Sequence, residues 1–242
     1  MNPLLEVRGV SLSFRGVRAV FNASISVAAN AIVALIGPNG AGKTTLFNMI
    51  AGASAPETGR ILFSGRTIDG LRPAEICDLG IARTFQIAKP FTGLSVLDNV
   101  TIGALKRNPR IDEARDCAKE ILTNLGLGAK RDLPASALTL PDRKRLEVAR
   151  AIATRPKLLL LDEAMAGLRP SECEAMIEFL RGINGTQGIA ILLTEHVMRV
   201  VMALAQSVVV LHQGEVVASG TPEQVVHEPA VLECYLGEKT FI

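Results

Sequence analysis

The feature that most constrains this chain is a glycine-rich stretch at residues 36–45, which reads IGPNGAGKTT. Residues 37–44 follow the pattern G-x-x-x-x-G-K-T of a phosphate-binding P-loop. The apolar run at 31–36 predicts a buried strand before it, and the helix-forming run at 43–51 predicts a helix after it. A strand, a glycine-rich turn and a helix N-terminus together aim backbone N–H groups at one anion. The sequence therefore predicts that the chain binds a nucleoside triphosphate.

Individual residues of this loop have expected roles. Gly40 and Gly42 allow the loop to curl without Cβ clashes. Lys43 is expected to reach the β- and γ-phosphates, and the hydroxyl group of Thr44 to ligate Mg²⁺. The residues expected to bind the nucleotide are Asn39, Gly40, Ala41, Gly42, Lys43, Thr44 and Thr45.

Length and composition limit the class of protein. With 242 residues, 48% of them hydrophobic and 21% charged, the chain is an ordinary globular protein that can bury a large core. A net charge of +2 is too small to indicate nucleic acid, so no nucleic-acid partner is expected. The four cysteines are far apart and form no C-x-x-C pair, which argues against a zinc site and fits a reducing cytosol.

Hydropathy bears on location. The chain has no run of about 18 apolar residues, and its N-terminus has no signal-peptide pattern. We therefore expect it to remain in the cytoplasm, where it can still bind a membrane protein.

Periodicity predicts an α/β fold with a mostly parallel sheet. Alternating hydrophobicity at 4–10 and 23–27 predicts an antiparallel hairpin before the P-loop. Residues 157–161 and 189–193 are too apolar for surface strands and predict central parallel strands. Other predicted strands are 60–63, 81–85, 207–211 and 215–219, and predicted helices are 73–79, 143–153, 170–184, 221–227 and 229–236.

A helical insertion is predicted at about 87–137, where prolines and glycine punctuate segments with helical spacing at 95–105 and 111–125. Counting the basic amphipathic helix that follows, this helical subdomain spans about 87–155 within a single domain of 1–242. The apolar face of the first segment is predicted to consist of Leu94, Val96, Leu97, Val100 and Ile102.

Two acidic residues follow the leucine run at 158–161. Such a strand ending in an acid is a Walker B pattern, in which Asp162 holds Mg²⁺ directly or through water. Glu163 is then placed to orient or deprotonate the attacking water. Alternatively, Glu163 only forms a salt bridge with a neighbouring residue.

An aromatic residue, Phe14, lies in an otherwise polar turn between two predicted strands. It is a candidate platform for stacking on a base. Alternatively, its ring packs on the edge of the core.

In this order, the motifs resemble those of ATP-binding cassette (ABC) ATPases along nearly the whole chain. Phe14 falls where the family has its adenine-stacking aromatic residue, and the signature-position helix follows the insertion. The remaining matches are residues 37–44 to Walker A, Gln86 to the Q-loop glutamine, Asp162 and Glu163 to the Walker B pair, and His196 to the switch histidine.

This resemblance implies an ABC-type P-loop NTPase core with an antiparallel β subdomain and an inserted helical subdomain. It implies ATP and Mg²⁺ as cofactors, with Glu163, His196 and Gln86 as catalytic residues. Thr44, Gln86 and Asp162 are the implied metal ligands. The implied partners are transmembrane permease subunits and a second ABC ATPase subunit, identical or different, at the inner face of the cell membrane.

Within the family, the chain most resembles the ATP-binding subunit of branched-chain amino acid importers. The resemblance lies in stretches such as RTFQ, RLEVARAIATRPKLLLLDE and EHVMRVVM, and in the tail that ends at 234–237. ATPases of lipopolysaccharide exporters share the Tyr-Leu-Gly tail, so the tail alone does not identify the cargo.

The chain departs from the family at the signature loop, where Leu-Ser-Gly-Gly-Gln is usual and residues 138–142 read LTLPD. Pro141 has no N–H to give to a phosphate, and Asp142 places an acid near an anion. Thr139 and Asp142 still have the spacing of a helix N-cap, so the helix is expected to form. The turn after Walker B reads Ala164-Met165, and Arg169 replaces the usual D-loop aspartate.

Three other classes are weighed against a transporter ATPase. Non-transport ABC ATPases of DNA repair or translation typically carry coiled-coil arms, zinc insertions or a second cassette, and none is seen here. P-loop kinases and GTPases give no reason for Gln86 or His196, and no N-K-x-D motif is present. A cassette that binds ATP without turnover is disfavoured by Glu163 and His196, unless the altered signature disables the dimer.

Overall fold

A computed structural model describes residues 3–85 and 89–236 of the chain, with ten strands in two sheets within those ranges. Sheet A is antiparallel, with strand order β2-β1-β4-β5. Sheet B has the order β10-β9-β3-β8-β7-β6 and is parallel except for the β9–β10 hairpin. The strands are β1 (Leu5–Phe14), β2 (Val17–Val27), β3 (Ile32–Ile36), β4 (Thr58–Phe63), β5 (Arg66–Thr67), β6 (Ile81–Arg83), β7 (Leu158–Asp162), β8 (Ala190–Thr194), β9 (Ser207–His212) and β10 (Glu215–Gly220).

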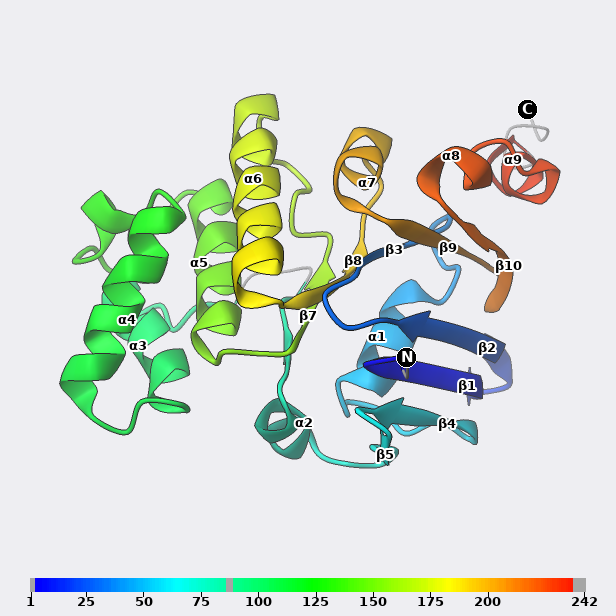
Figure 1. Cartoon of the computed structure of the whole chain (residues 1–242), viewed down its shortest axis with the longest axis horizontal. Helices are drawn as coiled ribbons and strands as arrows, with labels where there is room; N and C mark the ends of the chain where they lie inside the picture. The colour runs from blue at the N-terminus through cyan, green and yellow to red at the C-terminus, as the bar shows by residue number, and fades with distance from the viewer. Residues whose placement is uncertain (1–2, 86–88, 237–242) are drawn as a thin grey trace.

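The helices surround sheet B. Figure 1 shows α3, α4 and α5 together at one end of the molecule and α8 and α9 at the other. In the described part of the chain, none is long and apolar enough to cross a membrane. The α-helices are α1 (Lys43–Ile50), α2 (Pro73–Leu79), α3 (Val96–Leu105), α4 (Ile111–Asn124), α5 (Leu140–Ala153), α6 (Pro170–Gln187), α7 (Met198–Leu204), α8 (Pro222–Val225) and α9 (Pro229–Leu236), with 3₁₀ turns at Gly128–Lys130 and Ala135–Ala137.

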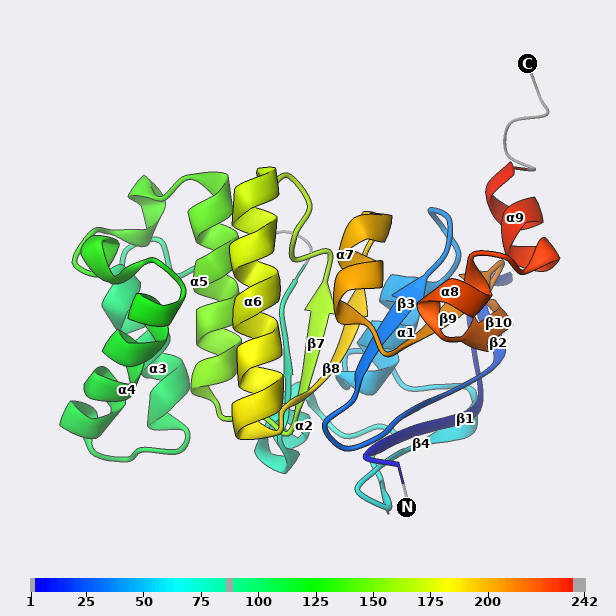
Figure 2. The ribbon, with the colours of Figure 1, turned by 45° about the horizontal axis from the view of Figure 1, so that its top comes forward.

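Two hydrophobic cores lie on opposite faces of sheet B. Figure 2 shows the elements that form them, with α5 and α6 on one side of β7 and β8 and α1 with sheet A on the other. Successive leucines of β7 alternate between them: Leu159 packs with the α3–α7 layer, whereas Leu158 and Leu160 pack with α1 and sheet A. Burial on both faces explains why the central strands are apolar throughout. The α/β fold predicted from the sequence, with its mostly parallel sheet, antiparallel β subdomain and helical subdomain, is confirmed.

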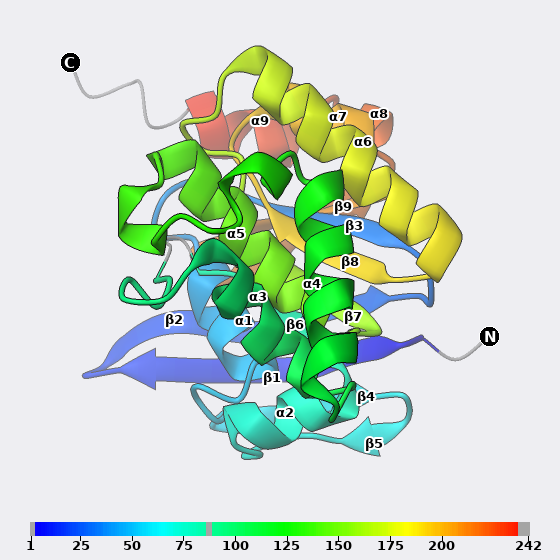
Figure 3. The ribbon, with the colours of Figure 1, turned by 90° about the vertical axis from the view of Figure 1, so that its left-hand side faces the viewer.

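The helical subdomain contains α3, α4 and α5, which pack together in front of the sheets in Figure 3. Val96, Leu97 and Val100 are buried as expected, but Leu94 and Ile102 are exposed. The predicted apolar face is therefore only partly buried, because Leu94 precedes the helix and Ile102 lies outside the buried stripe. The limits of about 87–155 remain a prediction.

Local signals account for most element ends. The β1–β2 turn places Arg15 and Gly16 at positive φ, as a tight two-residue hairpin requires. Gly80 ends α2 in the left-handed conformation. The strand predicted at 81–85 stops at Arg83, while the short strand β5 and the helix α7 were not predicted.

Candidate active site

The P-loop joins β3 to α1, which begins at Lys43. Gly42 caps the helix at a φ of 103°, and a Cβ there would lie 2.3 Å from the carbonyl oxygen of Ala19. Only glycine fits this position. The Lys43 Nζ donates to the carbonyl oxygens of Gly37 and Pro38 at 2.7 and 2.8 Å. Its ammonium group therefore lies inside the curled loop, while Thr44 at the helix start is exposed.

Asp162 ends β7 with a buried carboxylate. Its Oδ1 accepts from the Thr194 hydroxyl at 2.9 Å, and its Oδ2 accepts from the Arg83 guanidinium at 2.9 Å. Its backbone N–H donates to the Thr84 hydroxyl at 3.2 Å. These hydrogen bonds hold the buried carboxylate in a fixed orientation, as a metal ligand requires.

Glu163 and His196 meet beside Asp162. The Nε2 of His196 lies 2.6 Å from Oε1 of Glu163. Glu163 has a φ of 49°, unusual for a residue with a side chain and a form of strain found at functional sites. The turn is held by Thr194, whose carbonyl and hydroxyl oxygens accept from the Glu163 N–H, and by Lys144, whose Nζ donates to the Glu163 carbonyl at 2.8 Å.

Two charged residues behind this turn had no predicted role. Lys144 on α5 is buried, and burial lowers its pKa, opposed by the nearby Glu195 and Glu163. Burial raises the pKa of Glu195, although the N–H groups of Met165 and His196 donate to its carboxylate. Both residues support the segments that carry Glu163 and His196. No sequence pattern indicated these roles, because both depend on contacts between residues far apart in the chain.

Lys43, Asp162 and Glu163 form one electrostatic group. Burial lowers the pKa of Lys43, and the negative charges of Glu163 and Asp162 partly offset this effect. The site thus combines a phosphate loop, one ammonium group and two acids. Gln86, the predicted Q-loop glutamine, lies outside the described residues.

Phe14 lies at the end of β1, beside the hairpin turn, and its side chain is 49% exposed. This exposure argues against the alternative of a ring folded onto the core edge. The neighbouring strand β2 reaches the P-loop, where Ala19 lies against Gly42. Phe14 is therefore available for stacking at the hairpin that abuts the loop.

We expect Phe14→Ala to weaken ATP and ADP binding by a similar factor, equivalent to about 1–3 kcal/mol, because the ring would contact the base and not the phosphates. Titration with both nucleotides measures this. Phe21→Ala, which removes another exposed ring of the same sheet, is the control. Unchanged ATP affinity in Phe14→Ala would remove Phe14 from the site.

The signature-position loop precedes α5. As predicted, Thr139 is the N-cap: its Oγ1 accepts from the Asp142 N–H at 3.4 Å and donates to the Asp142 carboxylate at 2.8 Å. Asp142 is buried, and Lys130 lies 2.5 Å from its Oδ2. Burial alone would raise the pKa of Asp142, but Lys130 and Thr139 outweigh it and the pKa is lowered. The Asp142 carboxylate therefore points inward, and the positive charge of Lys130 offsets its negative charge.

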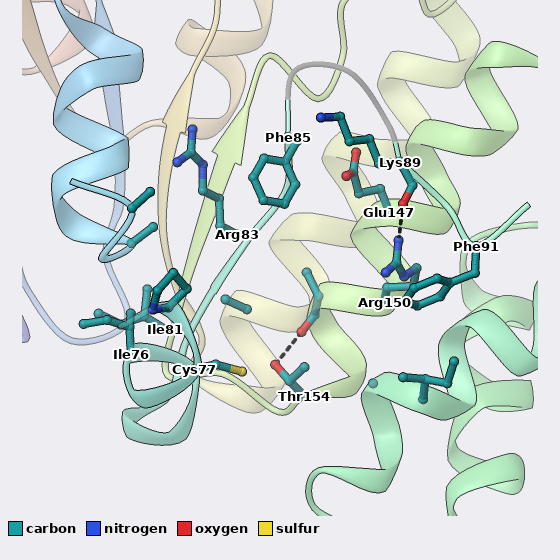
Figure 4. A pocket seen from close by; sticks show the side chains of 17 residues that line it. Ile76, Cys77, Ile81, Arg83, Phe85, Lys89, Phe91, Glu147, Arg150 and Thr154 are labelled. Carbon is teal, nitrogen blue, oxygen red and sulfur yellow. Dashed lines mark hydrogen bonds between the residues drawn. The ribbon is translucent and has the colours of Figure 1, made fainter. Parts of the chain in front are cut away.

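A groove of about 370 Å³ lies between the helical subdomain and the core, lined by α2, β6, α3 and α5 (Figure 4). Glu147 of α5 lines it, and the backbone N–H groups of Phe85 and Lys89 donate to its carboxylate. Arg150 donates to the carbonyl oxygen of Lys89 at 2.9 Å and stacks on Phe91. Helix α5 thus contacts the chain on both sides of residues 86–88.

Glu147 should make stability depend on pH. Burial raises its pKa from 4.5 to about 7. Between these values the unfolded chain ionises while the folded chain keeps its proton, so folding loses up to about 3 kcal/mol as pH rises through this window. We expect Glu147→Gln to melt higher than the wild type at pH 8 and no higher near pH 4.5. Glu120→Gln, at an exposed position on α4, is the control, and a pH-independent difference would contradict the expectation.

Comparison with known proteins identifies the family. The family model described as ABC transporter matches residues 20–166. A model described as branched-chain amino acid ATP-binding cassette transporter matches residues 215–239. The high-affinity branched-chain amino acid transport ATP-binding protein LivG of Escherichia coli (strain K12) is 38% identical over 251 residues, covering 98% of each chain. The lipopolysaccharide export system ATP-binding protein LptB of Acidithiobacillus ferridurans is 34% identical, covering 99% of each chain.

Solved structures agree with this assignment. The ADP conformation of MJ1267, an ATP-binding cassette of an ABC transporter, superposes with a TM-score of 0.87 at 29% identity and covers 98% of this chain and 100% of its own. A nucleotide-free cassette from an ABC transporter gives a TM-score of 0.87 at 30% identity, over 97% of this chain and 99% of its own. The family predicted from the motifs is thus confirmed over the full length. The chain belongs to the ABC transporter family and is one of its ATP-binding, ATP-hydrolysing proteins.

Proposed function

We propose that this chain is the ATP-hydrolysing subunit of an importer of branched-chain or related amino acids. The observation that carries the cargo class is the match of the C-terminal residues 215–239 to the branched-chain amino acid cassette model. The identity of 38% with LivG over 98% of the chain supports it. The catalytic part rests on the grouping of Lys43, Asp162, Glu163 and His196 described above.

The roles of the site residues form part of this proposal. Phe14 stacks on adenine, and residues 39–45 bind the phosphates of ATP. Thr44, Asp162 and Gln86 hold Mg²⁺, which would neutralise charge on the β- and γ-phosphates when bound. An exposed hydroxyl and a buried, hydrogen-bonded carboxylate are both oxygen ligands of the kind that Mg²⁺ prefers.

Glu163 acts on the water that attacks the γ-phosphate, by orienting it and accepting its proton. His196, whose Nε2 lies 2.6 Å from the Glu163 carboxylate, holds that side chain in place and contacts the γ-phosphate. The ammonium group of Lys43 binds the phosphates, whose negative charge is present both before and during the reaction. Gln86 completes the catalytic set.

The proposed partners are a second ABC ATPase subunit and transmembrane permease subunits. The second subunit would close its signature loop on this chain's nucleotide. The groove would receive a segment of the permease, since Phe85, Phe91 and Ile102 expose apolar surface along it. The chain would thus lie on the inner face of the cell membrane.

We expect Ile102→Glu to reduce copurification with the permease subunits at least about tenfold, because a charge would be buried in an apolar contact. Ile102 is 45% exposed on α3. Ile111→Glu is the matched control, since Ile111 is 52% exposed on α4 and does not line the groove. Both variants should bind ATP as the wild type does. Equal copurification of the two would place the permease elsewhere.

A lipopolysaccharide exporter is the second candidate, because LptB is 34% identical over 99% of both chains. The two are separated by deleting the gene and measuring uptake of labelled leucine, isoleucine and valine. We expect uptake to be lost and to be restored by the wild type but not by Glu163→Gln. Normal amino acid uptake together with defective lipopolysaccharide export would overturn the importer.

A further inference from the structure

Arg83, the last residue of β6, joins three elements through one guanidinium group. Its Nη2 donates to Oδ2 of Asp162 on β7 at 2.9 Å, and its Nη1 donates to Oδ1 of Asn48 on α1 at 2.6 Å. The motif comparison gave Arg83 no role beyond its place in RTFQ. Because its charge faces the Asp162 carboxylate directly, Arg83 supplies the counter-charge that a buried acid needs.

The guanidinium is held by few contacts. The Arg83 side chain is only 8% exposed and lies over the rings of Phe85 and Phe47, at 5.3 and 5.8 Å from their centroids. Its Nε is buried without a hydrogen-bond partner among residues 3–85 and 89–236. The two Nη atoms, through their hydrogen bonds, and the rings of Phe85 and Phe47 therefore set the orientation of the guanidinium plane. A shift of one ring changes that orientation.

Arg83 also belongs to the groove. Arg83 and Phe85 both line it, and Figure 4 shows Arg83 at the end of β6 and Phe85 on the segment that follows. Phe85 is 53% exposed, so a partner segment that enters the groove contacts its ring. The path from the groove to the ATP site then has two direct contacts: the Phe85 ring against the Arg83 guanidinium, and the guanidinium against Asp162.

We propose that Arg83 is a positioning residue for Asp162. When a partner segment fills the groove, Arg83 transmits this change to the metal-binding position of the ATP site. This rests on the proposed function, which makes Asp162 a metal ligand and the groove a permease contact. A permease segment that moves the Phe85 ring tilts the Arg83 guanidinium group. The guanidinium group in turn rotates the Asp162 carboxylate. Arg83 touches neither nucleotide nor water in this scheme and acts only through Asp162.

The first test uses the isolated chain with ADP, and compares thermal shifts in Mg²⁺ and in EDTA. In Arg83→Met, Mg²⁺ supplies the counter-charge that the guanidinium supplies in the wild type. The Mg²⁺-dependent shift should therefore grow, and the half-saturating Mg²⁺ concentration should fall at least about threefold. Affinity for ADP in EDTA should stay unchanged. Arg150→Met is the matched control, because Arg150 lines the same groove without contacting Asp162.

Identical Mg²⁺ dependence in Arg83→Met and Arg150→Met would overturn the assignment. Should Arg83→Met fail to fold, Arg83→Gln removes the charge but keeps a polar side chain, and Arg83→Lys keeps the charge without the planar fork. We expect Arg83→Gln to change the Mg²⁺ dependence in the direction of Arg83→Met and Arg83→Lys to retain the wild-type dependence. Wild-type Mg²⁺ dependence in Arg83→Gln also overturns the assignment.

The second test uses the assembled transporter and the ratio of its ATPase rate to that of the isolated chain. Arg83→Lys should lower this stimulation at least about threefold while Mg²⁺ dependence stays normal, because one ammonium group cannot hold Asn48 and Asp162 together. Retained stimulation in Arg83→Lys overturns the transmission. If the wild-type chain binds no permease, the proposed function fails instead, and the Mg²⁺ test on the isolated chain still decides the link between Arg83 and Asp162.

Discussion

Replacing Glu163 with glutamine is expected to lower ATP turnover at least about 10²–10³-fold while leaving ATP affinity nearly unchanged. Glutamine keeps the size of the side chain and a hydrogen-bonding oxygen near His196, 2.6 Å from the native carboxylate, but it cannot take a proton from water. The loss should therefore fall on the transition state and lower kcat without raising KM. The rate of phosphate release measures turnover, and nucleotide titration measures ATP affinity.

Lys43→Ala provides the contrasting variant. The Lys43 ammonium group meets phosphates that are charged before the reaction begins, so its removal should abolish most nucleotide affinity. Thermal shifts with ATP would show binding in Glu163→Gln and little in Lys43→Ala. Unchanged turnover in Glu163→Gln would exclude Glu163 as the residue that activates water and would favour its simpler role as a salt-bridge partner.

The sequence predicted the acids of this site because they end an apolar run, a local pattern. It missed Thr194, Arg83 and Lys144, which hold those acids from three other elements. Such contacts join residues far apart in the chain, and no periodicity indicates which side chains will meet. Glu147 illustrates the same limit, since its raised pKa depends on burial against segments more than fifty residues away.

The fold was more predictable, for a physical reason. Burial on both faces of sheet B leaves continuous apolar runs such as 158–161, and glycines such as Gly80 end helices where a left-handed residue is needed. Errors occurred where packing decides the outcome. Ile102 has the spacing of a core residue, yet it faces the groove, where the proposed function gives it a partner.

The second large effect concerns the signature loop. A dimer with a different cassette that keeps Ser and Gly in its signature would contain one complete site, built from Lys43, Glu163 and His196 here and the partner's loop. The opposite site would use residues 139–142 of this chain. There Pro141 offers no N–H, and the Thr139 hydroxyl already donates to Asp142 at 2.8 Å. The missing donor can cost roughly 10²–10³ in rate.

The structure weakens the opposite hypothesis, in which ATP is hydrolysed at both sites. The charge of Asp142 is offset by Lys130, so repulsion of phosphate is not the obstacle. Arg143 does not replace the missing donor, because it donates to the carbonyl oxygens of Leu138 and Ser136 at 3.0 and 2.8 Å. What remains for the phosphate is the N-terminus of α5, which is an anion site without its usual hydroxyl.

We therefore expect unequal losses when the catalytic glutamate of each cassette is changed to glutamine in turn in the assembled transporter. Glu163→Gln here should remove nearly all ATPase activity, and the same change in the partner only a small part. Pro141→Gly restores a backbone donor and should raise the activity that survives Glu163→Gln, whereas Arg131→Ala, at an exposed position nearby, should not. Equal losses from the two glutamate changes, or strong ATPase activity from this chain paired with itself, would contradict the asymmetry, because both require residues 139–142 to serve a working site.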